Sequence, residues 1–256
     1  MSRRQRTISL EAEIEGHGLF TGQTVHLRLR PAPPNTGLVL TRVDLGPEAT
    51  VTATIQSVAK RFQRTTLVNG EACVETTEHF LAALAGLGID NLYAEVNGPE
   101  MPAGDGSAAD YVRLLRQAGI VEQEGERPVL SIAEPITVQE GDALITALPG
   151  PEAELQLTYH LDYGPGGVIP PQVFSLKLTP DAFVEELATT RTFILDTDNN
   201  RQQDAADKVF ELGVPGDKPF AGDFDGKGVD TVGVYHETQP QTARAKAPAS
   251  AGTIAK

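Results

Sequence analysis

Cysteine is almost absent from this chain, because its 256 residues contain a single one, Cys73. One thiol excludes an internal disulfide, and such scarcity is typical of proteins that stay in a reducing compartment. Cys73 lies between Ala72 and Val74 in a strand-like run. We therefore expect a buried, unreactive thiol and not a nucleophile.

Basic residues and long apolar runs are scarce as well. The chain has 21 Lys and Arg against 35 Asp and Glu, which gives a net charge of -14. Because binding to nucleic acid requires clusters of Lys and Arg, this balance argues against nucleic acid as a partner. No apolar run is long enough to cross a membrane or to act as a signal peptide. We expect no integral membrane segment and a cytoplasmic location.

Short strands are expected over residues 6–70. Apolar and polar residues alternate in Thr24–Arg30, which predicts a strand with one buried and one wet face. His26 falls on the polar face, so we assign it no role. Asn69-Gly70 separates two strand-like runs and predicts a two-residue hairpin turn.

Two helices are expected before residue 120. Thr77 can cap the first, and Gly86 and Gly88 are expected to close it. Ser107 opens the second, with an acidic residue three positions later as in a capping box. Gly119 stands where the glycine that follows a helix belongs.

The second half of the chain repeats this pattern after a charged stretch at 123–128, which marks an expected domain boundary. Thr179-Pro180-Asp181 combines a cap, a proline at the first helical position and an acidic first turn, which predicts a third helix. Strands are expected before it at Leu130–Ile132, Ile136–Gln139, Ala143–Leu148 and Glu154–Asp162, the last with Leu155, Leu157, Tyr159 and Leu161 facing inward.

Strands followed by a helix in each half predict an α+β fold. We expect a two-layer sandwich of two α+β units with mainly antiparallel sheets, the second unit truncated, and a short β-rich tail. The expected domains are 1–126 (domain I), 127–195 (truncated domain II), 196–240 (a separate β segment) and 241–256. The last is rich in Ala, Pro and Lys, which predicts disorder.

Glu78 and His79 stand together at the start of the first expected helix. The positive end of the helix dipole favours a neutral imidazole, the form that binds a metal. It also favours an ionised carboxylate, which can take a proton from a metal-bound water. The pattern alone is equally typical of a solvated first turn, so it assigns no function by itself.

Context comes from longer motifs, among them EIEGHGLFTG at 13–22, TTEHFLAALAGLGIDN at 76–91 and GDGSA at 104–108. In these the chain resembles the UDP-3-O-acyl-N-acetylglucosamine deacetylase family, zinc amidases of bacterial lipid A synthesis. The resemblance covers about residues 5–195. It implies that His79 is one of three zinc ligands and that Glu78 is the general base. It further implies that Thr192 stabilises the oxyanion and that Phe193 contacts the substrate.

The chain departs from the family pattern at several positions. Phe20 stands where the glycine loop usually has a histidine, and His17 occupies a position that is usually apolar, so we expect His17 at the surface and not on a metal. The family's other two zinc ligands form a His-x-x-x-Asp motif, and a further histidine is its general acid. No His-x-x-x-Asp occurs in this sequence. Because a catalytic zinc needs three protein ligands, we expect an incomplete Zn²⁺ site.

The stretch PGDKPFAGDFDGKGVDTVGVY resembles one repeat of the FG-GAP type, which we assign to about 196–237. Asp223, Asp225 and Asp230 have the spacing of an oxygen-rich calcium-binding loop. The same spacing is equally typical of a solvated acidic turn, so a Ca²⁺ site in the tail is one of two interpretations. A single repeat cannot form a propeller, because such repeats bury their faces against neighbours.

Three functions follow from these patterns. The resemblance implies a zinc-dependent deacetylase of UDP-3-O-acyl-N-acetylglucosamine. We expect this chain to have little activity, because two of the three zinc ligands are missing. The first alternative is an inactive remnant that binds the acyl-sugar nucleotide without turnover. The second is a weak calcium-binding module of the adhesion type, acting through the tail.

Overall fold

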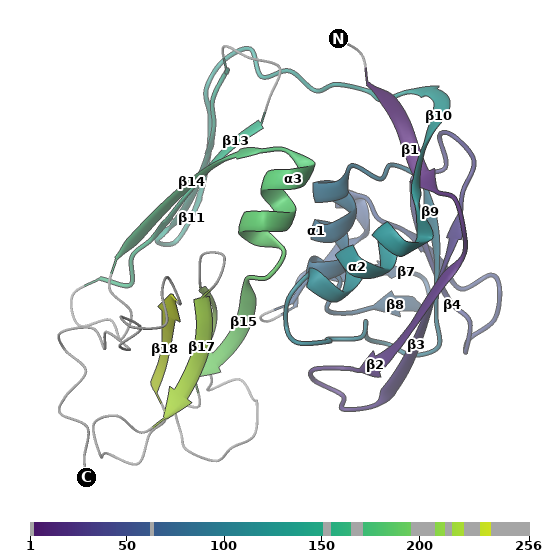
Figure 1. Cartoon of the computed structure of the whole chain (residues 1–256), viewed down its shortest axis with the longest axis horizontal. Coiled ribbons are helices and arrows are strands. Elements are labelled where there is room, and N and C mark those ends of the chain that lie inside the picture. Colours follow the sequence, from purple (N-terminus) through teal and green to yellow (C-terminus); the bar gives the residue numbers. More distant parts are fainter. Residues whose placement is uncertain are drawn as a thin grey trace.

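The computed structural model describes residues 3–61, 64–150, 155–164 and 171–195, and three further strands at 208–212, 217–222 and 231–236. Side chains are described as far as Arg191. Two parts lie side by side in Figure 1. The first holds the N-terminal strands with helices α1 and α2, and the second holds α3 with the later strands.

A five-stranded sheet forms the centre of the first part. Adjacent strands within this sheet are antiparallel except β4 and β9, which run parallel to each other. Along β3, buried residues alternate with exposed ones, so one face of the sheet is covered and the other is wet, as predicted. The strand order is β2 (Ala12–His17), β3 (Thr24–Pro31), β9 (Leu92–Val96), β4 (Leu38–Arg42) and β5 (Thr50–Thr52).

Two smaller sheets flank the central one. Asn69 pairs with Ala72 across the β7–β8 turn, and Gly70 has φ +57°, so the predicted hairpin at Asn69-Gly70 is confirmed. The first small sheet pairs β1 (Arg4–Ile8) with β10 (Ile120–Glu126), and the second joins β6 (Val58–Ala59), β7 (Thr66–Asn69) and β8 (Ala72–Val74). A 3-10 turn, η1 (Ile55–Ser57), precedes β6.

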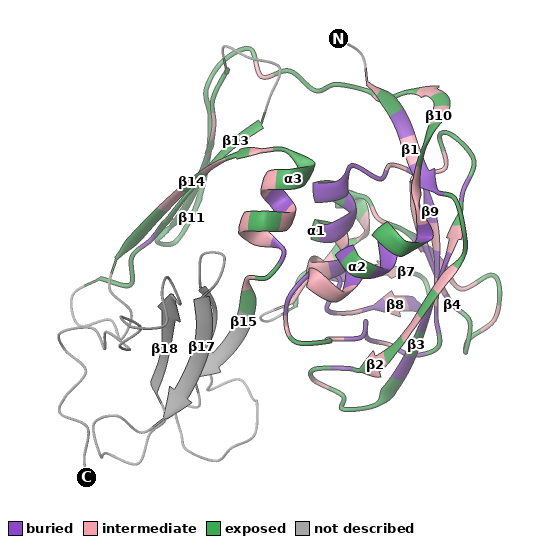
Figure 2. Cartoon of the chain, in the orientation of Figure 1, coloured by how far each residue is buried: buried purple, intermediate pink, exposed green. Residues whose placement is uncertain are grey.

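Helices α1 (Glu78–Leu87) and α2 (Ala109–Ala118) lie on one side of the central sheet (Figure 1). Their rings Phe80 and Tyr111 meet with centroids 5.4 Å apart, and Figure 2 shows buried residues on both helices. Gly88 and Gly119 follow the two helices with positive φ, as predicted. In the described part of the chain, no helix has the length and apolar character that crossing a membrane requires.

The second part consists of hairpins and one short helical segment. Thr179 Oγ1 accepts a hydrogen bond from the Ala182 amide at 3.1 Å, so the predicted cap is confirmed. The elements are β11 (Ile136–Glu140), β12 (Ala143–Ala147), β13 (Leu155–Leu161), β14 (Gln172–Leu178), α3 (Pro180–Ala182), the π-helical turn η2 (Phe183–Leu187), β15 (Arg191–Leu195), β16 (Lys208–Leu212), β17 (Asp217–Gly222) and β18 (Thr231–His236). These strands form four separate antiparallel pairs: β11 with β12, β13 with β14, β15 with β16, and β17 with β18.

Phe183 joins the two parts. Its side chain is only 5% exposed and belongs to the same apolar core as α1 and α2. A Cβ atom added to Gly86 would lie 2.2 Å from Phe183 Cγ. Because α1 continues to Leu87 and ends at Gly88, Gly86 lies inside the helix and does not close it, which corrects the prediction. Its missing side chain makes room for the Phe183 ring.

The expected α+β class with mainly antiparallel sheets is confirmed, whereas one expected strand is absent. Residues 130–132 form no strand, and Leu130 is 89% exposed. The charged stretch at 123–128 overlaps β10, which ends at Glu126 and pairs with β1. The division into domains stays a prediction.

The expected inward face of β13 is also wrong for three of its four residues. Leu155, Leu157 and Tyr159 are exposed, and Leu161 alone among the four is buried. The alternation itself is present, because Leu155 pairs with Leu178 and Leu157 pairs with Leu176 on the same face. A two-stranded sheet supplies too little neighbouring surface to cover that face.

Candidate functional site

Glu78 and His79 occupy the first turn of α1, and both side chains are half-buried. Thr77 precedes them at the N-cap position, as predicted, but makes no side-chain cap. Its hydroxyl instead donates to the Thr65 carbonyl at 3.1 Å. The start of the helix is therefore fixed by a neighbouring segment and not by its own cap.

Thr65 holds the Glu78 carboxylate as well. The Thr65 amide donates to Glu78 Oε2 at 2.9 Å, while the Thr65 carbonyl accepts from the Thr77 amide at 3.1 Å. This pair of contacts fixes the direction of the carboxylate relative to the helix. A carboxylate held in one direction has the orientation that a general base requires.

The acidic turn before α2 is centred on Asp105. Ser107 donates to Asp105 Oδ1 through its hydroxyl at 2.6 Å and its amide at 3.1 Å. The Ser107 hydroxyl accepts from the Ala109 amide at 3.1 Å, while Asp110 pairs with Arg113 at 2.8 Å. The predicted capping box is therefore wrong: the N-cap position belongs to Ala108, the Ser107 hydroxyl accepts from the amide two residues on and not three, and Asp110 forms an ion pair on the helix surface.

Asp105 also reaches the second part of the chain. Its Oδ2 accepts from Arg191 Nη2 at 2.9 Å and from Arg191 Nε at 3.2 Å. Burial raises the pKa of the Asp105 carboxyl, but the hydrogen bond from Ser107 and the charge of Arg191 outweigh it, so the pKa lies below its usual value. The bridge fixes the first residue of β15 to the loop before α2.

Thr192 and Phe193 follow Arg191 in β15, where they pair with Glu211 and Phe210 of β16. Their side chains lie outside the described residues. The expected convergence of Thr192 with Glu78 and His79 stays a prediction. The acidic residues of the expected calcium loop, 223–230, also lie outside the described residues.

A metal site of three ligands does not form among the described side chains, which include no group of three or more His, Cys, Asp or Glu close enough to share an ion. His17 ends β2 and is exposed, as expected. The described residues thus supply one of the three zinc ligands that the sequence resemblance implies, His79, and do not fit a complete zinc centre.

Cys73 is half-buried, not fully buried as expected. Burial and the nearby Glu75 carboxylate raise the pKa of its thiol. A raised pKa keeps the sulfur protonated at neutral pH and disfavours the reactive thiolate. This agrees with the expectation that Cys73 has no role as a nucleophile.

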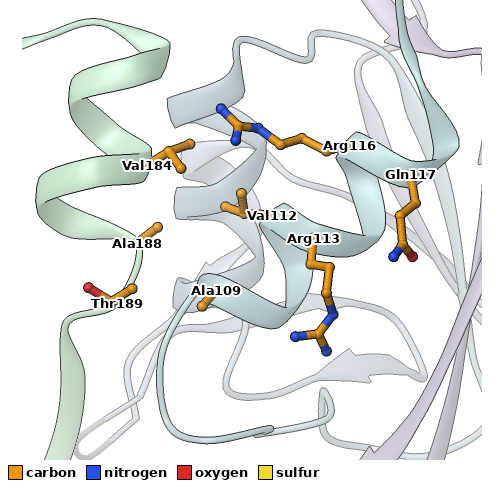
Figure 3. A pocket seen from close by; sticks show the side chains of 8 residues that line it. All are labelled: Ala109, Val112, Arg113, Arg116, Gln117, Val184, Ala188 and Thr189. Atoms are coloured by element: carbon orange, nitrogen blue, oxygen red, sulfur yellow. The ribbon is translucent and has the colours of Figure 1, made fainter. Parts of the chain in front are cut away.

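A groove of about 440 Å³ lies between α2 and η2 (Figure 3). It is away from Glu78 and His79, neither of which lines it. Arg113 and Arg116 extend from α2 along its rim, and Val184 comes from η2. The remaining lining residues are Ala109, Val112, Gln117, Ala188 and Thr189.

The sequence identifies the Glu78-His79 pair but not the residue that orients the Glu78 carboxylate. Thr65 carries no motif of its own, and only the fold brings it against Thr77 and Glu78. Asp105 had a signal, because it belongs to the GDGSA motif, and its partner Arg191 directly precedes Thr192 and Phe193. Nothing in the sequence showed that the two would pair.

Residues 5–207 match the protein family described as UDP-3-O-acyl N-acetylglycosamine deacetylase. The match runs past residue 195 into the segment that sequence reasoning gave to the FG-GAP-like repeat. The chain is 42% identical over 189 residues to the UDP-3-O-acyl-N-acetylglucosamine deacetylase of Thermosynechococcus vestitus, covering 74% of this chain and 65% of that protein.

Similar figures hold for two further deacetylases of the same name. Identity is 40% over 190 residues to that of Alcanivorax borkumensis, covering 74% of this chain and 62% of that protein. It is 40% over 205 residues to that of Legionella pneumophila strain Corby, covering 79% and 67%. The chain therefore spans a little under two thirds of the length of the first two relatives.

Proposed function

Because this chain belongs to the UDP-3-O-acyl-N-acetylglucosamine deacetylase family, we propose that it carries part of a site for removing the acetyl group from UDP-3-O-acyl-N-acetylglucosamine. The observation that carries the proposal is the placement of Glu78 and His79. Both lie half-buried on the first turn of α1, and Glu78 is held in one direction by the Thr65 amide at 2.9 Å.

The reaction hydrolyses an amide. Water adds to the acetyl carbonyl carbon, the carbon–nitrogen bond breaks, and acetate and a protonated amine leave. In our proposal Glu78 takes the proton from the attacking water, since its carboxylate is already oriented, and then gives that proton to the leaving nitrogen. Thr192 donates to the oxyanion that forms on the carbonyl oxygen, and Phe193 packs against the substrate. The Asp105–Arg191 bridge holds the strand that carries both residues.

Turnover by the chain with this sequence should be low. Family members use zinc to activate the water, and here His79 is the one family ligand among the described residues. His-x-x-x-Asp, which would supply the other two ligands, does not occur in the sequence. Zinc binding should therefore be weak. The second candidate function is binding of the acyl-sugar nucleotide without turnover, and the same missing motif favours it.

The experiment measures three quantities on purified residues 1–256: bound zinc by elemental analysis, acetate release, and affinity for UDP-3-O-acyl-N-acetylglucosamine by calorimetry. We expect measurable substrate affinity with little zinc and little acetate. Glu78→Gln should abolish any residual acetate release and leave affinity within about threefold, because the base acts on water and not on binding. Glu15→Gln, an exposed change on β2, is the matched control.

Two outcomes contradict the proposal in different ways. Near-stoichiometric zinc with robust turnover would show that other side chains complete the site, and His236 would be the first to mutate. If the protein does not bind UDP-3-O-acyl-N-acetylglucosamine, the proposed substrate is wrong. The calcium-binding alternative is tested by calorimetry with Ca²⁺ alone. No described residue supports calcium binding. The cytoplasmic location expected from the sequence also stays a prediction.

A further inference from the structure

Glu100 is a fully buried carboxylate, 0% exposed, beside the candidate site. It accepts hydrogen bonds from the Phe20 amide at 3.0 Å, the Thr21 amide and hydroxyl each at 2.9 Å, and the Thr76 hydroxyl at 2.9 Å. These donors are all neutral. An ionised carboxylate can remain buried only when several donors surround it, so the four contacts act as one unit.

The donors come from two segments that are distant in sequence. Phe20 and Thr21 belong to the glycine loop between β2 and β3, and Thr76 lies two residues before Glu78. The backbone fixes Glu100 itself, because the Glu75 amide donates to the Pro99 carbonyl at 2.8 Å. Glu100 thus joins the glycine loop to the residues that lead into α1.

Thr76 has an unusual backbone. Its φ is +56°, and it is 3% exposed. A β-branched residue in the left-handed region is strained and persists only where its surroundings enforce it. The Thr76 hydroxyl is held by Glu100 at 2.9 Å. Because Thr77 and the first turn of α1 follow directly, this strained residue sets the direction in which the helix begins.

The glycine loop approaches Glu100 as closely as glycine permits. A Cβ atom added to Gly18 would lie 2.3 Å from Glu100 Oε2. The loop is also fixed at Phe20, whose ring lies 4.1 Å from the Arg64 guanidinium carbon. Arg64 directly precedes Thr65, whose amide holds Glu78. Both attachments of the loop therefore lead to segments that set the position of Glu78.

We propose that Glu100 is a positioning residue of the candidate deacetylase site: its carboxylate ties the loop 18–21 to Thr76 and so orients Glu78 and His79 toward the substrate. Glu100 does not touch the substrate. The inference rests on the proposed function, since it assigns a purpose to an arrangement around the Glu-His pair.

Glu100→Gln is the first test, because it keeps the shape of the side chain. Oε1 and Oε2 each accept from at least one backbone amide. Whichever way the new amide group is placed, its NH₂ therefore faces an N–H donor. Glu95→Gln is the matched control, because Glu95 lies on β9 and makes ion pairs with Arg28 and Arg30 outside the loop.

The first readout is hydrogen exchange. In Glu100→Gln we expect the Phe20 and Thr21 amides to exchange at least about tenfold faster than in the wild type, since each loses a charge-assisted bond. The second readout is the NMR signal of the His79 ring, assigned with His79→Gln. We expect it to shift in Glu100→Gln and to stay in place in Glu95→Gln, with both proteins folded by circular dichroism.

Thr76→Val is a second variant that removes one bond only and avoids a buried amide mismatch. It should shift the His79 signal, while Thr76→Ser, which keeps the hydroxyl, should restore it. If Glu100→Gln does not fold, this pair decides the proposal. An unchanged His79 signal in Thr76→Val, or in folded Glu100→Gln, would overturn it.

Substrate affinity separates this inference from the proposed function. Because Glu78 acts on water and not on binding, we expect Glu100→Gln to bind UDP-3-O-acyl-N-acetylglucosamine within about threefold of Glu95→Gln. A loss of affinity of more than about tenfold would show that Glu100 acts on substrate binding itself and would overturn the positioning role. If the wild type binds no substrate, the proposed function fails, whereas the NMR and exchange measurements still decide whether Glu100 orients the pair.

Discussion

Replacing Gly86 by alanine tests how the two parts of the chain are joined. On an isolated helix the change should stabilise by about 1 kcal/mol, because glycine is the poorer helix former. Here the new Cβ atom would lie 2.2 Å from Phe183 Cγ. The ring must retreat by more than about 1 Å to reach ordinary contact, and because three of its atoms would lie within 2.6 Å of the new Cβ atom, the overpacking should cost about 2–3 kcal/mol, the upper part of the usual range. We expect Gly86→Ala to destabilise the protein by about 1–2 kcal/mol.

The effect of Gly86→Ala on the free energy of unfolding should change sign when the Phe183 ring is absent. Phe183→Ala alone should cost about 3–4 kcal/mol, since the ring is 5% exposed in the core. In that background Gly86→Ala should stabilise by about 0.5–1 kcal/mol, because only the helix preference remains. The two residues therefore should show a coupling energy of about 2 kcal/mol.

Urea unfolding followed by far-ultraviolet circular dichroism measures all four proteins, since the chain has no tryptophan for fluorescence. Gly98→Ala is the control: its Cβ atom would find Val25 Cγ2 at 3.7 Å, an ordinary contact, so stability should change by less than about 0.5 kcal/mol. The reasoning would be refuted if Gly86→Ala were neutral or stabilising in the wild type, or had the same effect in both backgrounds.

Three further outcomes are expected. The folded-state pKa of Asp105 is depressed, so the stability that its bridge to Arg191 adds is present above the unfolded pKa of about 3.9 and lost as pH falls through the folded value; Asp105→Asn should lower urea stability by less than about 1 kcal/mol at neutral pH, and the difference should vanish in acid. Cys73, with its raised pKa, should react with a disulfide reagent more slowly than a free thiol at neutral pH, and a rate that matches a free thiol would contradict this. Thr179→Ala should cost about 1 kcal/mol, because the Ala182 amide loses its acceptor, whereas Thr179→Ser should be near neutral.

The sequence by itself determined the local elements. Alternation along Thr24–Arg30, the hairpin at Asn69-Gly70 and the glycines Gly88 and Gly119 each depend on the conformational preferences of a few adjacent residues, so a reader of the chain could place them. The family resemblance also identified Glu78 and His79, and with them the class of chemistry proposed for the site.

Only the tertiary structure decided what holds that pair and which faces are covered. Glu100 became a link between the glycine loop and Thr76 because the fold brings residues about eighty positions apart within 3 Å. Gly86, expected to end α1, lies inside the helix, and its missing side chain makes room for Phe183 from the second part of the chain. Leu155 alternates correctly yet stays exposed. Periodicity shows which side of a strand is apolar, but burial depends on a second surface, and that surface comes from distant parts of the chain.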